Sequence, residues 1–255
     1  MKKLIYFLAI VLLIVSVTRP VSGEGLNWYC KREKDHRSPL YPPEFSFIKN
    51  MNAYGCDTRH TDYSEKEKVI YLTFDAGYEN GNVEKTLDIL KEKKVHAAFF
   101  ILGNLVENNT DLVLRMINEG HLVCNHTYSH RDMSKTNESE FLNELKRFEA
   151  CCLKKTGQEP SKFYRPPEGK FSIENLEWAK KSGYKTIFWS FAYADWDNKK
   201  QPSAEAAKNK ITENLHNGEI MLLHPTSDTN CEILSEVIDV ILSEGFRFAS
   251  LSELD

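Results

Sequence analysis

Short apolar runs alternate with amphipathic stretches from residue 68 to the end of the chain, and this alternation limits the possible folds most strongly. The runs are rich in β-branched and aromatic residues, which is typical of buried strands. They cover residues 69–74, 97–102, 122–124, 163–164, 186–189, 220–223 and 246–248. Between them, helices are predicted over residues 83–90, 112–117, 137–152, 172–181, 203–216 and 233–242. Continuous apolar strands separated by helices indicate a parallel sheet that is buried on both faces.

About seven such units predict an α/β fold, a closed or nearly closed β/α barrel. An open, doubly wound sheet is the alternative, and both folds place functional groups beyond the carboxyl ends of the strands. The chain has 255 residues, of which 27% are charged and 41% are hydrophobic, so it can form one large domain with its own core. Its net charge of −4 argues against a nucleic-acid partner, which usually requires a basic excess.

Residues 1–23 have the features of a secretory signal peptide. Two lysines precede an apolar run of fourteen residues, and small residues follow at Val21-Ser22-Gly23. The run is shorter than the roughly 20 residues that span a bilayer, so export is favoured over an uncleaved N-terminal anchor. We therefore expect a protein that is secreted or held at the cell envelope.

Residues 24–66 show no clear period and are expected to form an irregular lead-in that packs on a barrel domain of residues 67–255. The chain has six cysteines, and none forms the CxxC pairs of a zinc site. In an exported chain, buried thiols and one or two disulfides are both open possibilities. The first pair to test is Cys30 with Cys56, because both lie in the lead-in.

Chemically capable side chains follow five of the predicted strands, each near the point where its strand ends. These residues are Asp75, His126 with His130, Arg165, Asp195 with Trp196, and His224. A carboxylate at such a place often caps a helix, and a lone histidine is often a hydrogen-bonded core residue. No single residue is therefore decisive. Five strand ends that meet at one rim predict an active site.

The imidazoles of His126 and His130 are four residues apart, so one helical turn or a tight loop could bring both to a single cation. No glutamate follows His126, so this is not the HExxH helix of zinc proteases. Two histidines alone also fit a pair that serves only as hydrogen-bonding groups, and the sequence leaves both interpretations open.

Taken together, these motifs resemble the polysaccharide deacetylases, the NodB-type carbohydrate esterases. The motifs in the order of that family are Thr73-Phe74-Asp75, His126-x-x-x-His130, Arg165-Pro-Pro-x-Gly169, Asp195-Trp196 and Leu222-Leu223-His224. The resemblance covers about residues 67–250 and implies a distorted β/α barrel. Segment 74–81 is similar to one branch, the delta-lactam-biosynthetic de-N-acetylases of spore cortex peptidoglycan, which act on muramic acid residues.

The resemblance implies a role for each matching residue. A divalent cation, zinc or similar, held by His126 and His130 would polarise the acetamide carbonyl and its water. Asp75 would be the general base and His224 the general acid. Arg165 would pair with Asp75 and keep it ionised.

Further positions are implied around these groups. Asp195 would favour the cationic form of His224, because a nearby carboxylate stabilises imidazolium. Trp196 would form an apolar wall for the acetyl methyl group or the sugar face. Pro167 and Tyr78 are also expected to contact the substrate.

One position departs from the family pattern. The family has two adjacent aspartates, the second of which is a metal ligand, whereas Ala76 follows Asp75 in this chain. A methyl group cannot coordinate, and catalytic zinc normally has three protein ligands and a water, so we expect weakened metal binding. Glu79 on the same loop is a candidate substitute, although a helix cap or an exposed loop acid is the commoner role for such a residue.

We therefore expect a secreted hydrolase that removes N-acetyl groups from peptidoglycan amino sugars. The expected target is N-acetylmuramic acid, leading to muramic delta-lactam in the spore cortex. The expected partner is the glycan strand, with no protein partner. Two alternatives are a non-catalytic glycan-binding module on a degenerate barrel, which Ala76 favours, and a deacetylase of chitin-like oligosaccharides.

Overall fold

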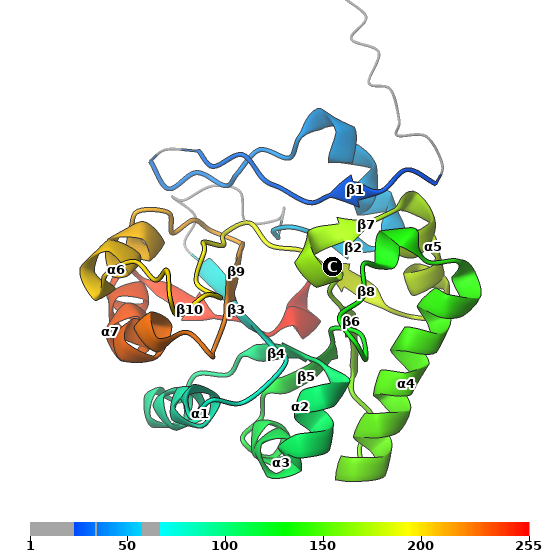
Figure 1. Cartoon of the computed structure of the whole chain (residues 1–255). Coiled ribbons are helices and arrows are strands. Elements are labelled where there is room, and N and C mark those ends of the chain that lie inside the picture. Colours follow the sequence, from blue (N-terminus) through cyan, green and yellow to red (C-terminus); the bar gives the residue numbers. More distant parts are fainter. Residues whose placement is uncertain (1–22, 34, 58–66, 255) are drawn as a thin grey trace, which may run out of the picture.

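The sheet is built around one long buried strand, β3 (Lys68–Ala76), which pairs with β9 on one side and with β10 and β4 on the other (Figure 1). The computed structural model describes residues 23–33, 35–57 and 67–254, and within them this sheet has eight strands, all paired in parallel. The other strands are β2 (Ala53–Tyr54), β4 (Ala98–Ile101), β5 (Leu122–Asn125), β6 (Ser161–Tyr164), β8 (Lys185–Ile187), β9 (Glu219–Leu223) and β10 (Phe246–Phe248).

The sheet curls into an incomplete barrel. Beyond β8 the chain runs beside β9, where Phe191 forms a parallel bridge with Met221, and the amide of Ser190 donates to the carbonyl of Ile220 at 3.0 Å. This contact joins the far end of the sheet back to the strand next to β3. The predicted distorted β/α barrel is confirmed, and all seven predicted strands are present. The eighth, β2, is a two-residue strand of the lead-in, too short to carry a periodic signal.

Helices cover the outer face of the sheet (Figure 1). They are α1 (Asn82–Lys93), α2 (Gly103–Asn108), α3 (Thr110–Asn118), α4 (Glu138–Thr156), α5 (Ile173–Lys181), α6 (Ala204–Thr212) and α7 (Asp228–Ser243), with short 3₁₀ turns η1 (Pro43–Met51), η2 (Met133–Lys135), η3 (Pro167–Gly169) and η4 (Leu251–Glu253). Six of the α-helices fall where the apolar period predicts them, and α2 is additional. The start of α4 has a capping box between Asn137 and Glu140. Helix α6 ends four residues earlier than predicted, because the buried His216 turns inward and its amide donates to Glu219 at 3.1 Å.

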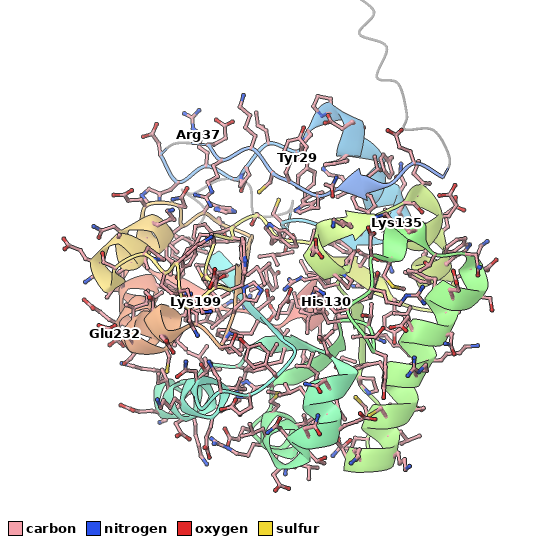
Figure 2. All side chains as sticks on the ribbon, in the orientation of Figure 1. Tyr29, Arg37, His130, Lys135, Lys199 and Glu232 are labelled. Carbon is pink, nitrogen blue, oxygen red and sulfur yellow. The ribbon has the colours of Figure 1, made fainter. Side chains whose placement is uncertain are left out.

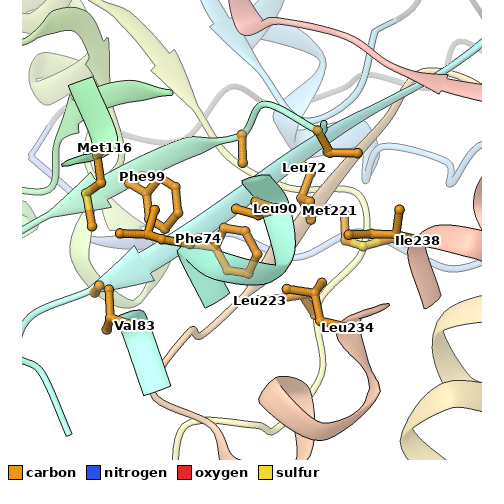
Figure 3. Close-up of a cluster of buried hydrophobic side chains, with 14 of the residues drawn as sticks. Leu72, Phe74, Val83, Leu90, Phe99, Met116, Met221, Leu223, Leu234 and Ile238 are labelled. Carbon is orange, nitrogen blue, oxygen red and sulfur yellow. The ribbon is translucent and has the colours of Figure 1, made fainter. Parts of the chain in front are cut away.

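Alternate residues of β3 face opposite sides of the sheet, as the strand period requires. Leu72 and Phe74 pack with the helices, and the ring of Phe74 stacks on that of Phe99 with centroids 5.1 Å apart (Figure 3). Thr73 and Asp75 therefore face the interior of the barrel. The polar residues near the end of β3 therefore point into the barrel, while the apolar residues between them pack in the core between the sheet and the helices.

The described part of the lead-in lies across the barrel beside β8. Strand β1 (Leu26–Asn27) pairs antiparallel with β7 (Lys170–Phe171). Trp28 stacks on Phe188 with centroids 4.4 Å apart, and its indole N–H donates to the carbonyl of Trp189 at 2.9 Å. Gly169 has a φ of +69°, and a side chain there would lie 2.8 Å from Trp189, so only glycine fits. Almost all of the predicted signal peptide (residues 1–22) and residues 58–66 lie outside the described residues.

All six cysteines are free thiols in this structure. The thiol of Cys30 donates to the carbonyl of Ser190 at 3.0 Å, and burial raises the pKa of Cys56 to about 11. The pair that we placed first for a disulfide is therefore not bridged. The thiols of Cys56, Cys124 and Cys152 are buried, and the other three are partly buried. Among the described residues, no helix combines the length and apolar character needed to cross a membrane.

Candidate active site

A cleft of about 680 Å³ opens at the carboxyl ends of the strands. Six of the nine predicted site residues line it: Asp75, Tyr78, His126, His130, Trp196 and His224. Arg165 and Asp195 are completely buried and bond to two of the lining residues. The expected convergence of the strand-end motifs at one rim is therefore present.

Arg165 lies beneath the cleft and pairs with Asp75, which lines it. Its Nη1 donates to Oδ1 of Asp75 at 2.6 Å. The guanidinium is fixed by further bonds, from Nη2 to the hydroxyl of Thr73 at 2.9 Å and from Nε to the carbonyl of Ile187 at 3.0 Å, and it lies over the ring of Phe100. A buried cation needs such a complete set of partners. Thr73 was not among the predicted site residues, although its position two residues before Asp75 places it on the same face of β3.

This pairing decides the charge of Asp75. Burial by itself would raise the pKa of the carboxyl, but the charge of Arg165, together with His126 and His224 when they are protonated, outweighs it and holds the pKa of Asp75 below its ordinary value. Asp75 is therefore ionised at neutral pH. Because Oδ1 is engaged by Arg165, Oδ2 is the oxygen that lies near His126, 3.6 Å from its Nε2.

The two histidines come from a tight loop after β5 that is held by its own side chains. Thr127 and His130 both have positive φ angles, 73° and 58°. Asn125 accepts from the amide of Thr127 at 2.9 Å, and the hydroxyl of Thr127 accepts from the amide of His130 at 3.0 Å. The buried carboxylate of Glu144, on α4, accepts from both the amide and the hydroxyl of Ser129. The loop thus has one fixed shape, and the two imidazole centroids lie 5.1 Å apart.

The surroundings of His126 fix its tautomer. Its Nδ1 lies 2.9 Å from the carbonyl of Arg165, which can only accept, so Nδ1 carries the hydrogen and Nε2 has the free lone pair. Burial lowers the pKa of His126 to about 4, so the ring is neutral at neutral pH. A neutral imidazole whose other nitrogen donates to a carbonyl is the form that binds metal ions. His130 lies near the centre of the view in Figure 2.

These residues fit a divalent cation only in part. The two imidazoles supply two ligands, but Ala76, which is among the residues that line the cleft, has no side-chain atom that could coordinate. Glu79, the candidate substitute ligand, is engaged elsewhere, because its two oxygens accept from the amides of Gly81 and Val83 at the start of α1. The expectation that Glu79 replaces the missing metal ligand is therefore wrong, and its carboxylate instead caps the start of α1. Among the residues that the structure describes, no group of three or more potential ligands exists.

His224 and Asp195 form a second pair across the cleft. The two carboxylate oxygens of Asp195 accept from Nδ1 of His224 at 2.7 Å and from its backbone amide at 2.8 Å. Burial would lower the pKa of His224, but the bond to Asp195 and the charges of Asp195 and Asp75 raise it above its ordinary value. With Nδ1 engaged, Nε2 of His224 is the nitrogen that can exchange a proton in the cleft. The cleft thus contains an ionised carboxylate and a protonatable imidazole, the two kinds of group that general base and general acid catalysis require.

The rim of the cleft is aromatic. Trp196 is 62% exposed, with its ring centroid 6.1 Å from that of His224, and Tyr78 is 49% exposed. Pro167 is buried and is not among the described residues that line the cleft; the next residue, Glu168, lines it instead. Glu168 has φ 56°, and this left-handed turn lies within the Arg-Pro-Pro-x-Gly motif.

Tyr193 and Trp189 also line the cleft, and sequence reasoning missed them. Tyr193 lies two residues before Asp195, and this short spacing is the signal that could have drawn attention to it. Trp189 was assigned to the predicted strand 186–189, but β8 ends at Ile187 and the chain then turns toward the cleft.

Several known proteins are similar to this chain in sequence and in fold. A family model described as polysaccharide deacetylase matches residues 62–187. The sequence is 36% identical over 235 residues to the peptidoglycan-N-acetylmuramic acid deacetylase PdaA of Bacillus subtilis, covering 92% of this chain and 87% of that protein. The solved structure of B. subtilis PdaA, described as a family 4 carbohydrate esterase, matches with a TM-score of 0.85 and 36% identity, over 92% of this chain and 98% of that chain.

Two further similar proteins are also deacetylases or carbohydrate esterases. A peptidoglycan-N-acetylglucosamine deacetylase of Bacillus cereus is 34% identical, covering 89% of this chain and 80% of that protein. The structure of a family 4 carbohydrate esterase from Bacillus anthracis matches with a TM-score of 0.74 and 36% identity, over 91% of this chain and 97% of that chain. With the β/α barrel and the ordered strand-end motifs in place, these matches show that the chain belongs to the polysaccharide deacetylase family.

Proposed function

We propose that this protein is a peptidoglycan deacetylase that removes the acetyl group from N-acetylmuramic acid residues of the glycan strand. One observation carries the proposal: Asp75, paired with Arg165, and His224, paired with Asp195, belong to the same cleft. Binding alone requires no such set of acid and base groups. The muramic acid deacetylase among the relatives supports this choice of sugar.

The two pairs account for amide hydrolysis. A water molecule attacks the acetamide carbonyl carbon while the carboxylate of Asp75 takes up one of its protons. The C–N bond then breaks as Nε2 of His224 donates a proton to the leaving nitrogen. The products are acetate and the free amine of the sugar. Arg165 keeps Asp75 ionised and aimed, and Asp195 holds the imidazole of His224 in one orientation.

His126 and His130 would hold a divalent cation, zinc or similar, which when bound would polarise the carbonyl and the attacking water. The neutral state and fixed tautomer of His126 support this assignment. Ala76 leaves the cation one protein ligand short of the usual three, so its affinity is weakened.

The aromatic rim is where the sugar would lie. Trp196 is exposed beside His224 and offers an apolar face for a pyranose ring or the acetyl methyl group, and Tyr78 is exposed on the loop that follows Asp75. Pro167 would act from behind the rim, through the turn that presents Glu168 to the cleft.

The location follows from the substrate. Peptidoglycan lies outside the cytoplasm, and the basic and apolar pattern of residues 1–23 supports export or retention at the cell envelope. In this assignment residues 24–66 are a lead-in and residues 67–255 are the deacetylase domain. On muramic acid, the freed amine is close to the lactyl carboxyl of the same sugar, so deacetylation prepares the delta-lactam of spore cortex.

A second candidate is a glycan-binding module without activity, which the presence of Ala76, a residue that cannot coordinate a metal ion, favours. The deciding experiment measures acetate released from peptidoglycan strands without stem peptides and from chitin oligomers, with and without a chelator. We expect release from the peptidoglycan strands, with new amines on muramic acid. Release from chitin alone would assign a different polymer. Binding of the strands with no release from either polymer would favour the binding module.

A further inference from the structure

A buried amide lies directly behind the pair of Asp195 and His224. Asn230 is in the first turn of α7 and is 2% exposed. Its Nδ2 donates to Oδ2 of Asp195 at 2.6 Å and is 3.2 Å from the carbonyl of His224. The hydroxyl of Ser227, the N-cap of α7, accepts from the backbone amide of Asn230 at 3.0 Å. One carboxamide on a capped helix therefore contacts both members of the pair.

The orientation of this amide is fixed by Tyr193. The phenolic hydroxyl of Tyr193 donates to Oδ1 of Asn230. Burial and the charge of Asp195 raise the pKa of Tyr193, so the phenol keeps its hydrogen and acts as a donor. A carboxamide oxygen can only accept and its nitrogen can only donate. The hydroxyl therefore holds the oxygen end, and the nitrogen end is directed at Asp195.

Asp195 needs these donors because it is completely buried. Its Oδ1 accepts from Nδ1 of His224, and its Oδ2 accepts from the backbone amide of His224 and from Asn230. A buried carboxylate without enough donors is destabilised and takes whatever orientation restores them. Without Asn230, Oδ2 would keep a single donor, and that donor belongs to the very residue that Asp195 must orient.

We infer that Asn230 is a positioning residue for the deacetylation reaction: its carboxamide anchors the carboxylate of Asp195 to α7, so that Asp195 can hold the imidazole of His224 with Nε2 toward the cleft. Asn230 does not line the cleft and acts only through Asp195 and His224. The inference rests on the proposed function, in which His224 is the proton donor.

Two variants separate hydrogen bonding from packing. Asn230→Ala removes the amide, whereas Asn230→Asp keeps its shape but places a second carboxylate against Asp195. In assays near pH 7, we expect both variants to lose on the order of 10²-fold in kcat, with KM within about twofold of the original, because the acid is misplaced while sugar contacts remain. Asn230→Asp with normal kcat would overturn the inference, since packing alone would then explain the residue.

The matched control is Asn175→Ala. Asn175 is also a completely buried asparagine in the first turn of a helix, α5, where it forms a capping box with Ser172. Its loss should lower the melting temperature without changing kcat. If the control variant loses as much kcat as Asn230→Ala does, the effect is a general one of stability, and the inference fails.

A spectroscopic measurement tests the same point without turnover. The proton on Nδ1 of His224, in its 2.7 Å bond to Asp195, should give a far-downfield proton resonance that is absent in His224→Gln. We expect Asn230→Ala and Asn230→Asp to lose this resonance and Asn175→Ala to keep it. If the original protein released no acetate but the resonance still depended on Asn230, the proposed function would fail and the positioning role would stand.

Tyr193→Phe is a milder variant that keeps Asn230 and tests the inference if the Asn230 variants do not fold. Without the hydroxyl, the amide is free to turn, so the resonance should weaken and kcat should fall by less than in Asn230→Ala. A resonance unchanged in both position and intensity would contradict the role assigned to Asn230.

Discussion

His126 donates its Nδ1 hydrogen to the backbone carbonyl of Arg165 at 2.9 Å. Arg165 therefore contacts two residues that line the cleft, since its main chain fixes the tautomer of His126 while its guanidinium donates to Asp75 at 2.6 Å. Asp75 and His126 are thus oriented by the same residue, which is completely buried. We therefore expect a change at Asp75 to affect chiefly activity, and a change at Arg165 to affect chiefly stability.

Asp75→Asn should abolish most of the activity while the fold is kept. The amide is nearly the same size as the carboxylate but cannot take a proton from water, so we expect kcat to fall by about 10²–10⁴-fold. Acetate release measures the loss, and the far-ultraviolet circular dichroism spectrum checks the fold. Near-normal turnover by a folded variant would remove Asp75 as the base.

Arg165→Met should chiefly affect stability. It leaves the buried carboxylate of Asp75 without its cation, and breaking a buried ion pair in this way costs about 3–5 kcal/mol. Urea unfolding measures the change. The double variant with Asp75→Asn should recover part of this loss, because the unpaired charge is then gone. Strictly additive losses in the double variant would show that the two groups are not coupled.

The parts of the fold and site that the sequence predicts are those with a local signal. Apolar runs mark the strands, and the side chains at their ends, such as Asp75 and His224, must meet at one rim in any parallel barrel. The helix-cap role of Glu79 was also visible locally, because it lies just before the helical period begins. The cleft could therefore be anticipated from one-dimensional patterns and the order of the motifs.

The supporting residues could not be predicted because their roles depend on long-range contacts. Asn230 meets Asp195 from 35 residues away, and Glu144 reaches the loop of the histidines from the middle of α4. Both lie at ordinary helical positions in the sequence, where a polar residue usually faces solvent. The two-residue strand β2 likewise exists only because β8 offers it an edge.

Asp195→Asn should move the basic limb of the pH profile of kcat to lower pH. Asp195, Asp75 and Arg165 are the charged groups that act on His224, and Asp195 is the main reason that its pKa is raised. In the variant, burial dominates and the pKa of His224 falls, so the protonated acid is lost at a lower pH. An unchanged basic limb in the acetate-release profile would mean that His224 is not the acid.

The same pair makes a pH-dependent contribution to stability. Because the pKa of His224 is raised in the folded protein, its stabilising contribution is fully present below the ordinary pKa of histidine and is lost as the pH rises through the raised value. Asp195→Asn should therefore lower the melting temperature more at acidic than at alkaline pH. This difference is a control for the kinetic result, since it does not require turnover.

Trp196→Ala should weaken substrate binding rather than proton transfer. The ring is 62% exposed in the cleft, and an aromatic contact of about 0.5–1.5 kcal/mol corresponds to a rise in KM of roughly 2–13-fold. The matched control is Leu153→Ala, because Leu153 is 48% exposed on α4 and does not line the cleft. We expect KM to rise only in the first variant. Equal KM values in both would place the sugar elsewhere.

Ala76→Asp should strengthen metal binding, because it adds a carboxylate to a cleft that otherwise offers two imidazoles. We expect the affinity for Zn²⁺, measured by calorimetry, to rise by roughly tenfold or more, equivalent to about 1.4 kcal/mol. Ala76 is 3% exposed, so the new charge should also lower the melting temperature of the metal-free variant, and added Zn²⁺ should restore it. The gain must depend on the imidazoles, so His126→Gln in the same background should remove it. If Ala76→Asp binds Zn²⁺ no better than the original chain, His126 and His130 are not a metal-binding pair, and their fixed loop serves hydrogen bonding alone.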